Sequence, residues 1–301
     1  MEDVTGEDCT VRAVIIGVVV THAAPAAQLE RCLAALLADG SLDRIIVVDN
    51  GGGAIVPERD DPDDAAGLLD VVRTDNRGYG AAANDGFALA AELGAEHVAL
   101  LNDDVIVRPG WTAPLVAALA RDDRLGAVQP KLLFADREPP TINSLGVEVD
   151  EFGAGHDLGF GDPDRSAEPA DIAAFTGGAV LFRCGFLDAT GGFDERYFLY
   201  YEDVDLAARG RALGWRYRCV PDSVVEHIGS ATTSGDPSRT LYLQERNRLW
   251  CAARNADART IARAAWLSLR RLRHEPRGVH ARALLAGTAG APVRLWERRS
   301  G

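Results

Sequence analysis

Two clusters of carboxylates stand at positions where an α/β protein places its chemistry. Asp103 and Asp104 follow the apolar run 98–101, with Asn102 between, and this run predicts a buried strand. Two adjacent carboxylates repel one another unless a cation lies between them, so the pair predicts a divalent-metal site. A simpler interpretation is that the two side chains only end the strand and cap a turn.

The second cluster consists of Glu202, Asp203 and Asp205, at the start of a helix predicted over 202–213. Free N–H groups and the helix dipole favour ionised carboxylates at such a position, and a general base must be ionised. Helix capping is the alternative, but it explains one or two of the three acids. The aromatic residues just before the cluster suit a site that holds a sugar or excludes water, or a place in the core: Phe198, Tyr200 and Tyr201.

A glycine motif, Gly78-Tyr-Gly80-Ala-Ala-Ala83, matches the dinucleotide-binding pattern G-x-G-x-x-A. It follows the third predicted strand, whereas the dinucleotide motif follows the first strand of its fold. An NAD-type oxidoreductase is therefore one interpretation, and it leaves both acidic clusters without a role. The other is that the glycines let the backbone approach a phosphate or pack closely on the sheet.

Strands and helices alternate along the first hundred residues. The runs 14–20, 45–49, 68–73 and 97–101 predict buried strands, and 26–38 and 79–93 predict helices. This order predicts an α/β fold with a mostly parallel sheet flanked by helices. Polar residues at the strand ends would then meet at one edge of the sheet. Further elements are expected at 111–121 (helix), 126–134 (strand), 179–182 (strand), 215–220 (strand) and 224–227 (strand), with a loop-rich stretch over 135–170.

The charge of the chain divides into two unequal parts. The net charge is −13, which argues against a nucleic-acid partner. Residues 1–239 hold 41 acidic and 19 basic side chains, whereas residues 240–301 hold 4 acidic and 13 basic ones. We place a boundary near 236, between a domain over 11–235 and a basic extension over 236–301 with helices at 241–266 and 281–285. This extension would either contact an anionic membrane surface or pair two copies of the chain.

Targeting signals are not evident in the sequence. The five cysteines are widely spaced, the first residues are acidic where a secretory signal would be basic, and the apolar runs are short. We therefore expect a cytoplasmic protein without a membrane span, with peripheral contact at the inner face of the membrane as an option.

Taken together, these segments resemble the family-two glycosyltransferases, inverting enzymes of the GT-A fold, and among them the bacterial rhamnosyltransferase-like branch. The resemblance covers roughly residues 14–230. It is carried by Val18-Val-Val-Thr21, Val47-Val-Asp49-Asn50, Asn76-Arg-Gly-Tyr-Gly80, Leu101-Asn-Asp-Asp104, Thr176-Gly-Gly178, Gly192-Phe-Asp-Glu-Arg-Tyr-Phe198 and Tyr201-Glu-Asp-Val-Asp-Leu206.

The resemblance implies a role for each site residue. Thr21, Asp49 and Asn76 correspond to contacts with the base and ribose of a nucleotide-sugar, with Gly78 and Asp103 beside them. Asp103 and Asp104 correspond to the D-x-D-type metal site for Mg²⁺ or Mn²⁺, and His227 completes it. Asn102 departs from the full D-x-D pattern at its first position. Asp203 corresponds to the catalytic base.

For the reaction, the resemblance favours transfer of L-rhamnose from dTDP-rhamnose to a glycolipid, polysaccharide precursor or other glycan. A UDP-sugar such as UDP-galactofuranose is the alternative donor. Acceptor contacts are expected from Glu202, Trp111, Tyr200 and Gly178.

Overall fold

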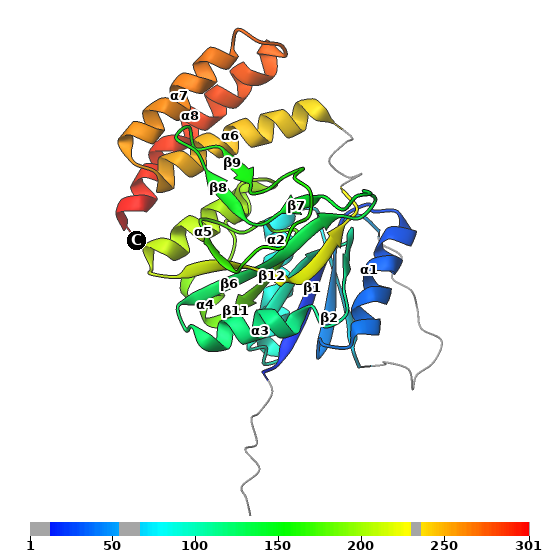
Figure 1. The fold of residues 1–301 in the computed structure, drawn as a ribbon. Helices are drawn as coiled ribbons and strands as arrows, with labels where there is room; N and C mark the ends of the chain where they lie inside the picture. The colour runs from blue at the N-terminus through cyan, green and yellow to red at the C-terminus, as the bar shows by residue number, and fades with distance from the viewer. Residues whose placement is uncertain (1–12, 54–66, 230–235, 301) are drawn as a thin grey trace, which may run out of the picture.

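The first four strands form the parallel part of one large sheet. The computed structural model describes residues 13–53, 67–229 and 236–300 (Figure 1); the expectation about the acidic N-terminal segment falls outside these ranges. β1 (Ile15–Thr21) is buried along its whole length, as its β-branched run predicts for a central strand. It pairs in parallel with β2 (Arg44–Asn50) and β4 (His97–Asn102), and β2 pairs in parallel with β3 (Leu69–Thr74).

The rest of the sheet is mixed. β11 (Ala179–Arg183) runs antiparallel between β4 and β6 (Leu125–Phe134), and β6 pairs in parallel with β12 (Arg216–His227). The two strands expected at 215–220 and 224–227 are thus one strand, with a register shift between Val220 and Val224. The short strands are β5 (Val105–Val107), β7 (Ile142–Ser144), β8 (Val147–Val149), β9 (Gly155–Asp157) and β10 (Ala170–Ile172). Three of them, β7, β8 and β9, give structure to the stretch expected to be loop-rich.

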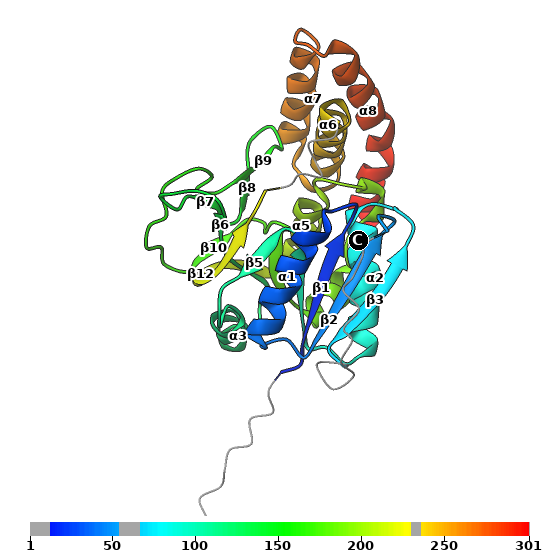
Figure 2. The ribbon, with the colours of Figure 1, turned by 90° about the vertical axis from the view of Figure 1, so that its right-hand side faces the viewer.

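Helices cover both faces of the sheet (Figure 2). α1 (Ala26–Asp39) and α3 (Thr112–Arg121) pack on one face, and α2 (Tyr79–Glu92), α4 (Cys184–Thr190) and α5 (Glu202–Ala212) pack on the other. A short 3-10 helix, η1 (Glu195–Tyr197), lies before α5. The α/β fold with helices on both sides of the sheet is the one predicted from the alternation of elements.

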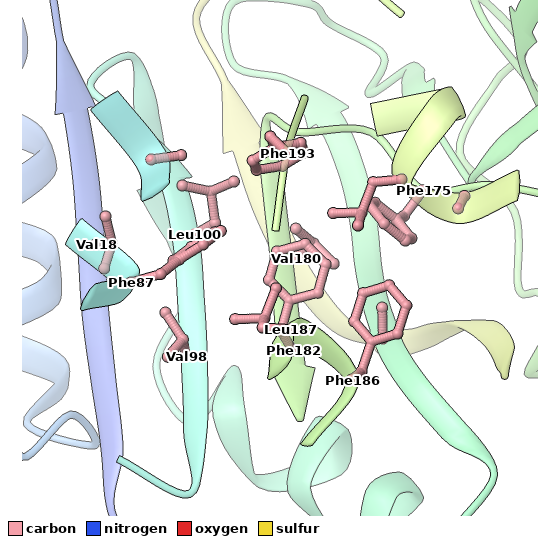
Figure 3. Packing of buried hydrophobic residues seen from close by; sticks show 14 of the residues in the cluster. Val18, Phe87, Val98, Leu100, Phe175, Val180, Phe182, Phe186, Leu187 and Phe193 are labelled. Atoms are coloured by element: carbon pink, nitrogen blue, oxygen red, sulfur yellow. The ribbon is translucent and has the colours of Figure 1, made fainter. Parts of the chain in front are cut away.

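Alternate residues of each central strand enter the two cores. Val18, Val98 and Leu100 face the second set of helices, where they meet a group of aromatic rings (Figure 3). The rings of Phe182 and Phe186 are stacked with centroids 5.8 Å apart. Such rings bury a large apolar area each, so this core supplies much of the hydrophobic stabilisation of the body.

Three helices follow the sheet and stand above the carboxyl ends of its parallel strands (Figures 1 and 2). They are α6 (Pro237–Asn255), α7 (Ala258–Arg271) and α8 (Arg277–Ser300). The helix expected over 241–266 is therefore divided, because Asp257 caps a new helix by accepting a hydrogen bond from the Thr260 N–H at 2.7 Å. In the parts of the chain that the structure describes, no helix is long and apolar enough to cross a membrane.

Ion pairs join these helices to the α/β body. Arg254 of α6 and Arg294 of α8 both reach Asp194, at 2.9 and 2.6 Å, and Arg254 also reaches the buried Asp205 at 3.2 Å. Glu297 pairs with Arg196 at 2.6 Å. The three helices are thus packed against the body through charged groups as well as apolar ones.

Candidate active site

A cavity of about 850 Å³ lies at the carboxyl ends of the parallel strands, between the body and the C-terminal helices. This is the edge where an open α/β sheet binds its ligands. Its lining includes acids of both predicted clusters, except the buried Asp205, and polar residues from the strand ends. These residues are Asn50, Asn76, Asn102, Asp103, Asp104, Glu202, Asp203 and His227.

The first acid pair follows β4, as its position in the sequence predicts. Asp103 is buried, and its Oδ1 accepts a hydrogen bond from Gln28 Nε2 of α1 at 2.9 Å. Burial raises the pKa of Asp103, although Thr21 and Gln28 act in the opposite direction. Asp104 is only 2% exposed, and neither of its carboxylate oxygens has a hydrogen-bond partner.

His227, at the end of β12, faces Asp104. Its Nε2 lies 3.1 Å from Asp104 Oδ1, and its Nδ1 lies 3.1 Å from Asn143 Oδ1. An amide oxygen that accepts from Nδ1 leaves Nε2 as the free lone pair, which is the orientation of a metal-binding imidazole.

The bare oxygens of Asp104 and the bare Nε2 of His227 fit a divalent cation. Among the residues whose placement is described, no group of three or more acidic, histidine or cysteine side chains gathers as a metal site. These two side chains would therefore share the ion with water and with a ligand. Asp103 accepts a hydrogen bond from Gln28, so it is less free than Asp104 to coordinate the ion.

The second pair, Glu202 and Asp203, begins α5 on another side of the same cavity. Asp203 accepts backbone N–H bonds from Val204 at 2.8 Å and from Gly177 at 3.2 Å. Burial nevertheless raises the pKa of Asp203. The N–H groups at the start of α5 therefore offset only part of the effect of desolvation, which the argument from the sequence did not consider. Glu202 is buried, its Oε2 has no partner, and burial together with the neighbouring Asp203 charge raises its pKa as well.

The segment 197–201 connects the two sides of the cavity. Its residues Phe198, Tyr200 and Tyr201 all have left-handed backbone angles, with φ between 69° and 71°, and all three line the cavity. The sequence predicted this aromatic wall, but the strained backbone has no sequence signal. Strain of this kind persists only where surrounding contacts hold it.

The glycine motif is explained by close packing against that segment. A Cβ on Gly78 would lie 2.4 Å from the Phe198 carbonyl oxygen, and Gly78 has φ 104°. The Tyr79 N–H at the start of α2 donates to the Phe198 oxygen at 2.7 Å, so it is not free for a pyrophosphate. This geometry does not match the dinucleotide-binding interpretation.

The residues expected to contact a nucleotide lie together at the ends of β1, β2 and β3. Asn76 lines the cavity, and its Nδ2 lies 3.3 Å from Nε2 of His22, another lining residue. Thr21 and Asp49 stand at the predicted strand ends but are buried beneath the lining, where Asp49 accepts the Gly52 N–H at 2.9 Å. Their chain neighbours His22 and Asn50 reach the cavity in their place.

The expected acceptor residues separate into two groups. Glu202, Tyr200 and Gly178 line the cavity. Trp111 does not: it is 2% exposed and packs in the core between α3 and the sheet, so stacking on a sugar does not fit its position. A large aromatic residue just before a helix is equally suited to a core, and the spacing in the sequence could not distinguish the two.

Sequence reasoning missed two parts of the wall. His156 and Asp157 come from the β8–β9 hairpin, and Asp157 faces Asp203 closely enough to raise its pKa. The C-terminal helices add Leu241, Gln244, Glu245, Arg248 and Arg271. From the sequence, 135–170 was expected only to be rich in loops and 236–301 to be a basic helical extension, so no local signal identified these residues of the wall.

Comparisons with known proteins agree with this architecture. The family model described as "Glycosyltransferase like family 2" matches residues 13–252, which extends into α6. An N-acetylglucosaminyl-diphospho-decaprenol L-rhamnosyltransferase from Mycobacterium tuberculosis is 29% identical over 272 residues, covering 79% of this chain and 87% of that protein. The O-antigen biosynthesis protein RfbC of Myxococcus xanthus is 31% identical over 159 residues, which cover 49% of this chain and 12% of that protein.

Two solved structures share the fold. GalNAc-T7 with UDP, GalNAc and Mn²⁺ superposes with a TM-score of 0.66 and 17% identity; the match covers 94% of this chain and 57% of that one. A mannosyltransferase from Pyrobaculum calidifontis with GDP-Man and Mn²⁺ superposes with a TM-score of 0.54 and 17% identity, covering 94% of this chain and 88% of that one.

Proposed function

The chain belongs to glycosyltransferase family 2, and from that premise we propose that it transfers L-rhamnose from dTDP-rhamnose, with inversion, to a lipid-linked or other glycan acceptor. The rhamnose assignment is supported by the mycobacterial relative, whose similarity extends over most of both chains. That relative is named for an acceptor made of N-acetylglucosamine on a decaprenyl diphosphate, and we propose an acceptor of the same chemical class here.

The observation that carries the proposal is the placement of two acidic pairs around one cavity. The hydroxyl of the partly buried Tyr79 donates to the Gly177 carbonyl at 2.6 Å, and its pKa is raised by desolvation and then by the charges of both pairs. Tyr79 therefore lies near both pairs. One pair can bind a cation and a diphosphate while the other faces the opposite side of a sugar.

Asp104 and His227 would hold the divalent ion, because their bare oxygens and Nε2 are turned toward one another. Such an ion neutralises the charge that develops on a departing nucleoside diphosphate. Asn143 fixes the imidazole through Nδ1, and Gln28 keeps the neighbouring Asp103 turned toward α1. These two hydrogen bonds thus orient the side chains around the proposed ion.

Asp203 is the proposed base. Its Oδ1 and Oδ2 accept backbone N–H bonds, which hold the carboxylate in place while a lone pair remains for an acceptor hydroxyl. The hydroxyl oxygen would attack the anomeric carbon as Asp203 takes its proton, and the bond to the diphosphate would break. A single displacement inverts the configuration and needs no second carboxylate as nucleophile.

One face of α7 suits contact with an anionic membrane that carries a lipid-linked acceptor. Trp266 and Leu269 are 51% and 56% exposed, and the exposed Arg270 and Arg273 lie beside them at helical spacing. In the described chain Arg270 and Arg273 have no acidic partner. Trp266 stacks on Phe152 of the hairpin that lines the cavity, with ring centroids 6.3 Å apart, so this surface adjoins the site.

A donor panel tests the proposal. Purified full-length chain would be incubated with dTDP-rhamnose, UDP-galactofuranose, UDP-glucose or GDP-mannose, each with Mn²⁺, Mg²⁺ or EDTA. The acceptor would be a short-chain prenyl-diphospho-N-acetylglucosamine. We expect thermal stabilisation and transfer with dTDP-rhamnose and a divalent ion, and an inverted linkage by NMR.

Three results would contradict parts of the proposal. Preference for a UDP-sugar would overturn the rhamnose donor but not the family. Full activity in EDTA would contradict the proposed metal site at Asp104 and His227. A product that retains the anomeric configuration would contradict both the single displacement and the role of Asp203 as base.

A further inference from the structure

We propose that Asn247 of α6 is a positioning residue for the reaction, because its amide holds the segment 197–201 and so fixes where Asp203 stands. The inference rests on the proposed function, in which Asp203 is the base. It gives the helical extension a part in catalysis beyond lining the cavity. Asn247 itself does not line the cavity and is completely buried.

Three carbonyl groups of the segment converge on the Asn247 side chain. Asn247 Nδ2 donates to the carbonyl oxygens of Tyr197 at 3.0 Å, Leu199 at 2.8 Å and Tyr200 at 2.7 Å. Phe198 and Tyr200 in this stretch have positive φ, each 69°. The Asn247 amide has two N–H groups for three carbonyls, so one N–H is shared between two of them, and the Tyr197 carbonyl also accepts from Arg246.

Arg246 fixes which way the amide points. Its Nε donates to Asn247 Oδ1 at 2.8 Å, and its guanidinium also donates to the Tyr197 carbonyl at 2.8 Å. A guanidinium only donates, so the Asn247 oxygen must face Arg246 and the nitrogen must face the three carbonyls. Arg246 lies over the Trp250 ring at 4.3 Å, which holds the guanidinium in turn.

The segment leads directly into the base. Tyr201 is the residue before α5, the helix has no side-chain cap there, and the Tyr201 carbonyl accepts the Asp205 N–H at 2.9 Å. The start of α5 is therefore set by the backbone that precedes it. On its other side the segment is fixed by Tyr79, whose N–H binds the Phe198 carbonyl. Without Asn247, the carbonyls of Leu199 and Tyr200 would lose the donor that Asn247 supplies, whereas the Tyr197 carbonyl would keep Arg246.

The test compares Asn247→Ala with a matched control. Ser223→Ala removes a buried hydroxyl of β12 that donates to the Trp111 carbonyl at 2.7 Å, away from both the segment and the cavity lining. We expect Asn247→Ala to lower kcat by about 10- to 100-fold, the scale on which a displaced catalytic group acts. The Kd for dTDP with Mn²⁺ should stay within about twofold, because Asp104 and His227 are untouched.

Two further measurements separate positioning from stability. The acidic limb of the kcat–pH profile should shift in Asn247→Ala and stay in place in Ser223→Ala, since only the first alters the surroundings of Asp203. Arg246→Ala should show a smaller loss of kcat. It replaces Asn247→Ala as the test variant if Asn247→Ala does not fold. A kcat within about twofold of wild type, per mole of folded Asn247→Ala protein, would overturn the proposal.

The inference can fail separately from the proposed function. If Asp203→Asn keeps normal turnover, Asp203 is not the base, whatever Asn247 does. Hydrogen exchange of the backbone amides of 198–204 does not depend on the chemistry, and it should be faster in Asn247→Ala than in Ser223→Ala. Equal exchange rates in the two variants would overturn the proposal that Asn247 holds the segment 197–201 in place.

Discussion

The α/β body and the C-terminal helices carry opposite charge and use it differently. In the body, acidic side chains are gathered around the cavity, and those of Asp104 and Glu202 include buried oxygens without a hydrogen-bond partner. In the helices, Arg248, Arg254 and Arg294 are directed inward, to Glu245, Asp205 and Asp194. Charge left without a partner indicates a place for a ligand, whereas charge that is paired internally supports the fold.

This difference narrows the role of the basic extension. Its excess of arginine suggested a whole surface for anionic lipid, but several of those arginines pair with acidic side chains of the body or of the helices themselves. The face of α7 around Trp266 remains exposed, and α8 also exposes large apolar residues such as Leu285. The extension therefore packs against the cavity with many of its arginines, and the α7 face is the one that adjoins the site.

The largest effect is expected at the proposed base. Asp203→Asn keeps the size of the side chain but cannot accept a proton, so transfer should fall by about a thousandfold or more. Binding of dTDP with Mn²⁺ should remain near normal by calorimetry. Asp122→Asn is the matched control, because Asp122 also accepts a backbone N–H, from Arg124, and does not line the cavity. An active Asp203→Asn enzyme would show that Asp203 is not the general base.

The next effect concerns the ion-binding side of the body. Asp104→Ala removes one of two groups that would hold the cation, and it should weaken Mn²⁺-dependent binding of dTDP by about a hundredfold. In EDTA the variant and the wild type should bind dTDP equally weakly. Unchanged affinity in Mn²⁺, measured by calorimetry, would count against Asp104 as a ligand.

The pH dependence of transfer tests whether burial controls the base. Burial raises the pKa of Asp203 to about 6. A base must be ionised, so kcat should be constant above this pKa and fall by about tenfold per pH unit below it. The measurement is a kcat profile from about pH 5 to pH 8, a range that includes this pKa. A rate that stays level down to about pH 5 would show that the pKa of the Asp203 carboxyl is not raised.

The smallest effect is expected on the outer face of α7. The double variant Trp266→Ser and Leu269→Ser should reduce flotation with vesicles rich in phosphatidylglycerol by about tenfold, through loss of buried apolar area. Phe160→Ser with Leu213→Ser is the matched control, since both residues are exposed apolar side chains of the body. Equal flotation of the two double variants would leave α7 without a membrane role.

Much of the fold and part of the site could be predicted from the sequence. The β-branched runs at Ile15–Thr21 and Arg44–Asn50 are buried parallel strands, since residues apolar on both faces suit only a covered strand. The acids after β4 and at the start of α5 do face one cavity. Trp111 was the clearest failure, because the type of a side chain does not say whether it faces the core or a ligand.

Hydrophobic periodicity and short motifs are local properties, so the order of the elements and the residue types at the strand ends could be predicted from them. Three other features became evident only in the folded chain: Asp104 faces His227, the β8–β9 hairpin and α6 complete the cavity wall, and Asn247 bonds to the carbonyls of Tyr197, Leu199 and Tyr200. These contacts join residues from about 50 to more than 100 positions apart, and the free energy that selects them comes from packing of the whole chain.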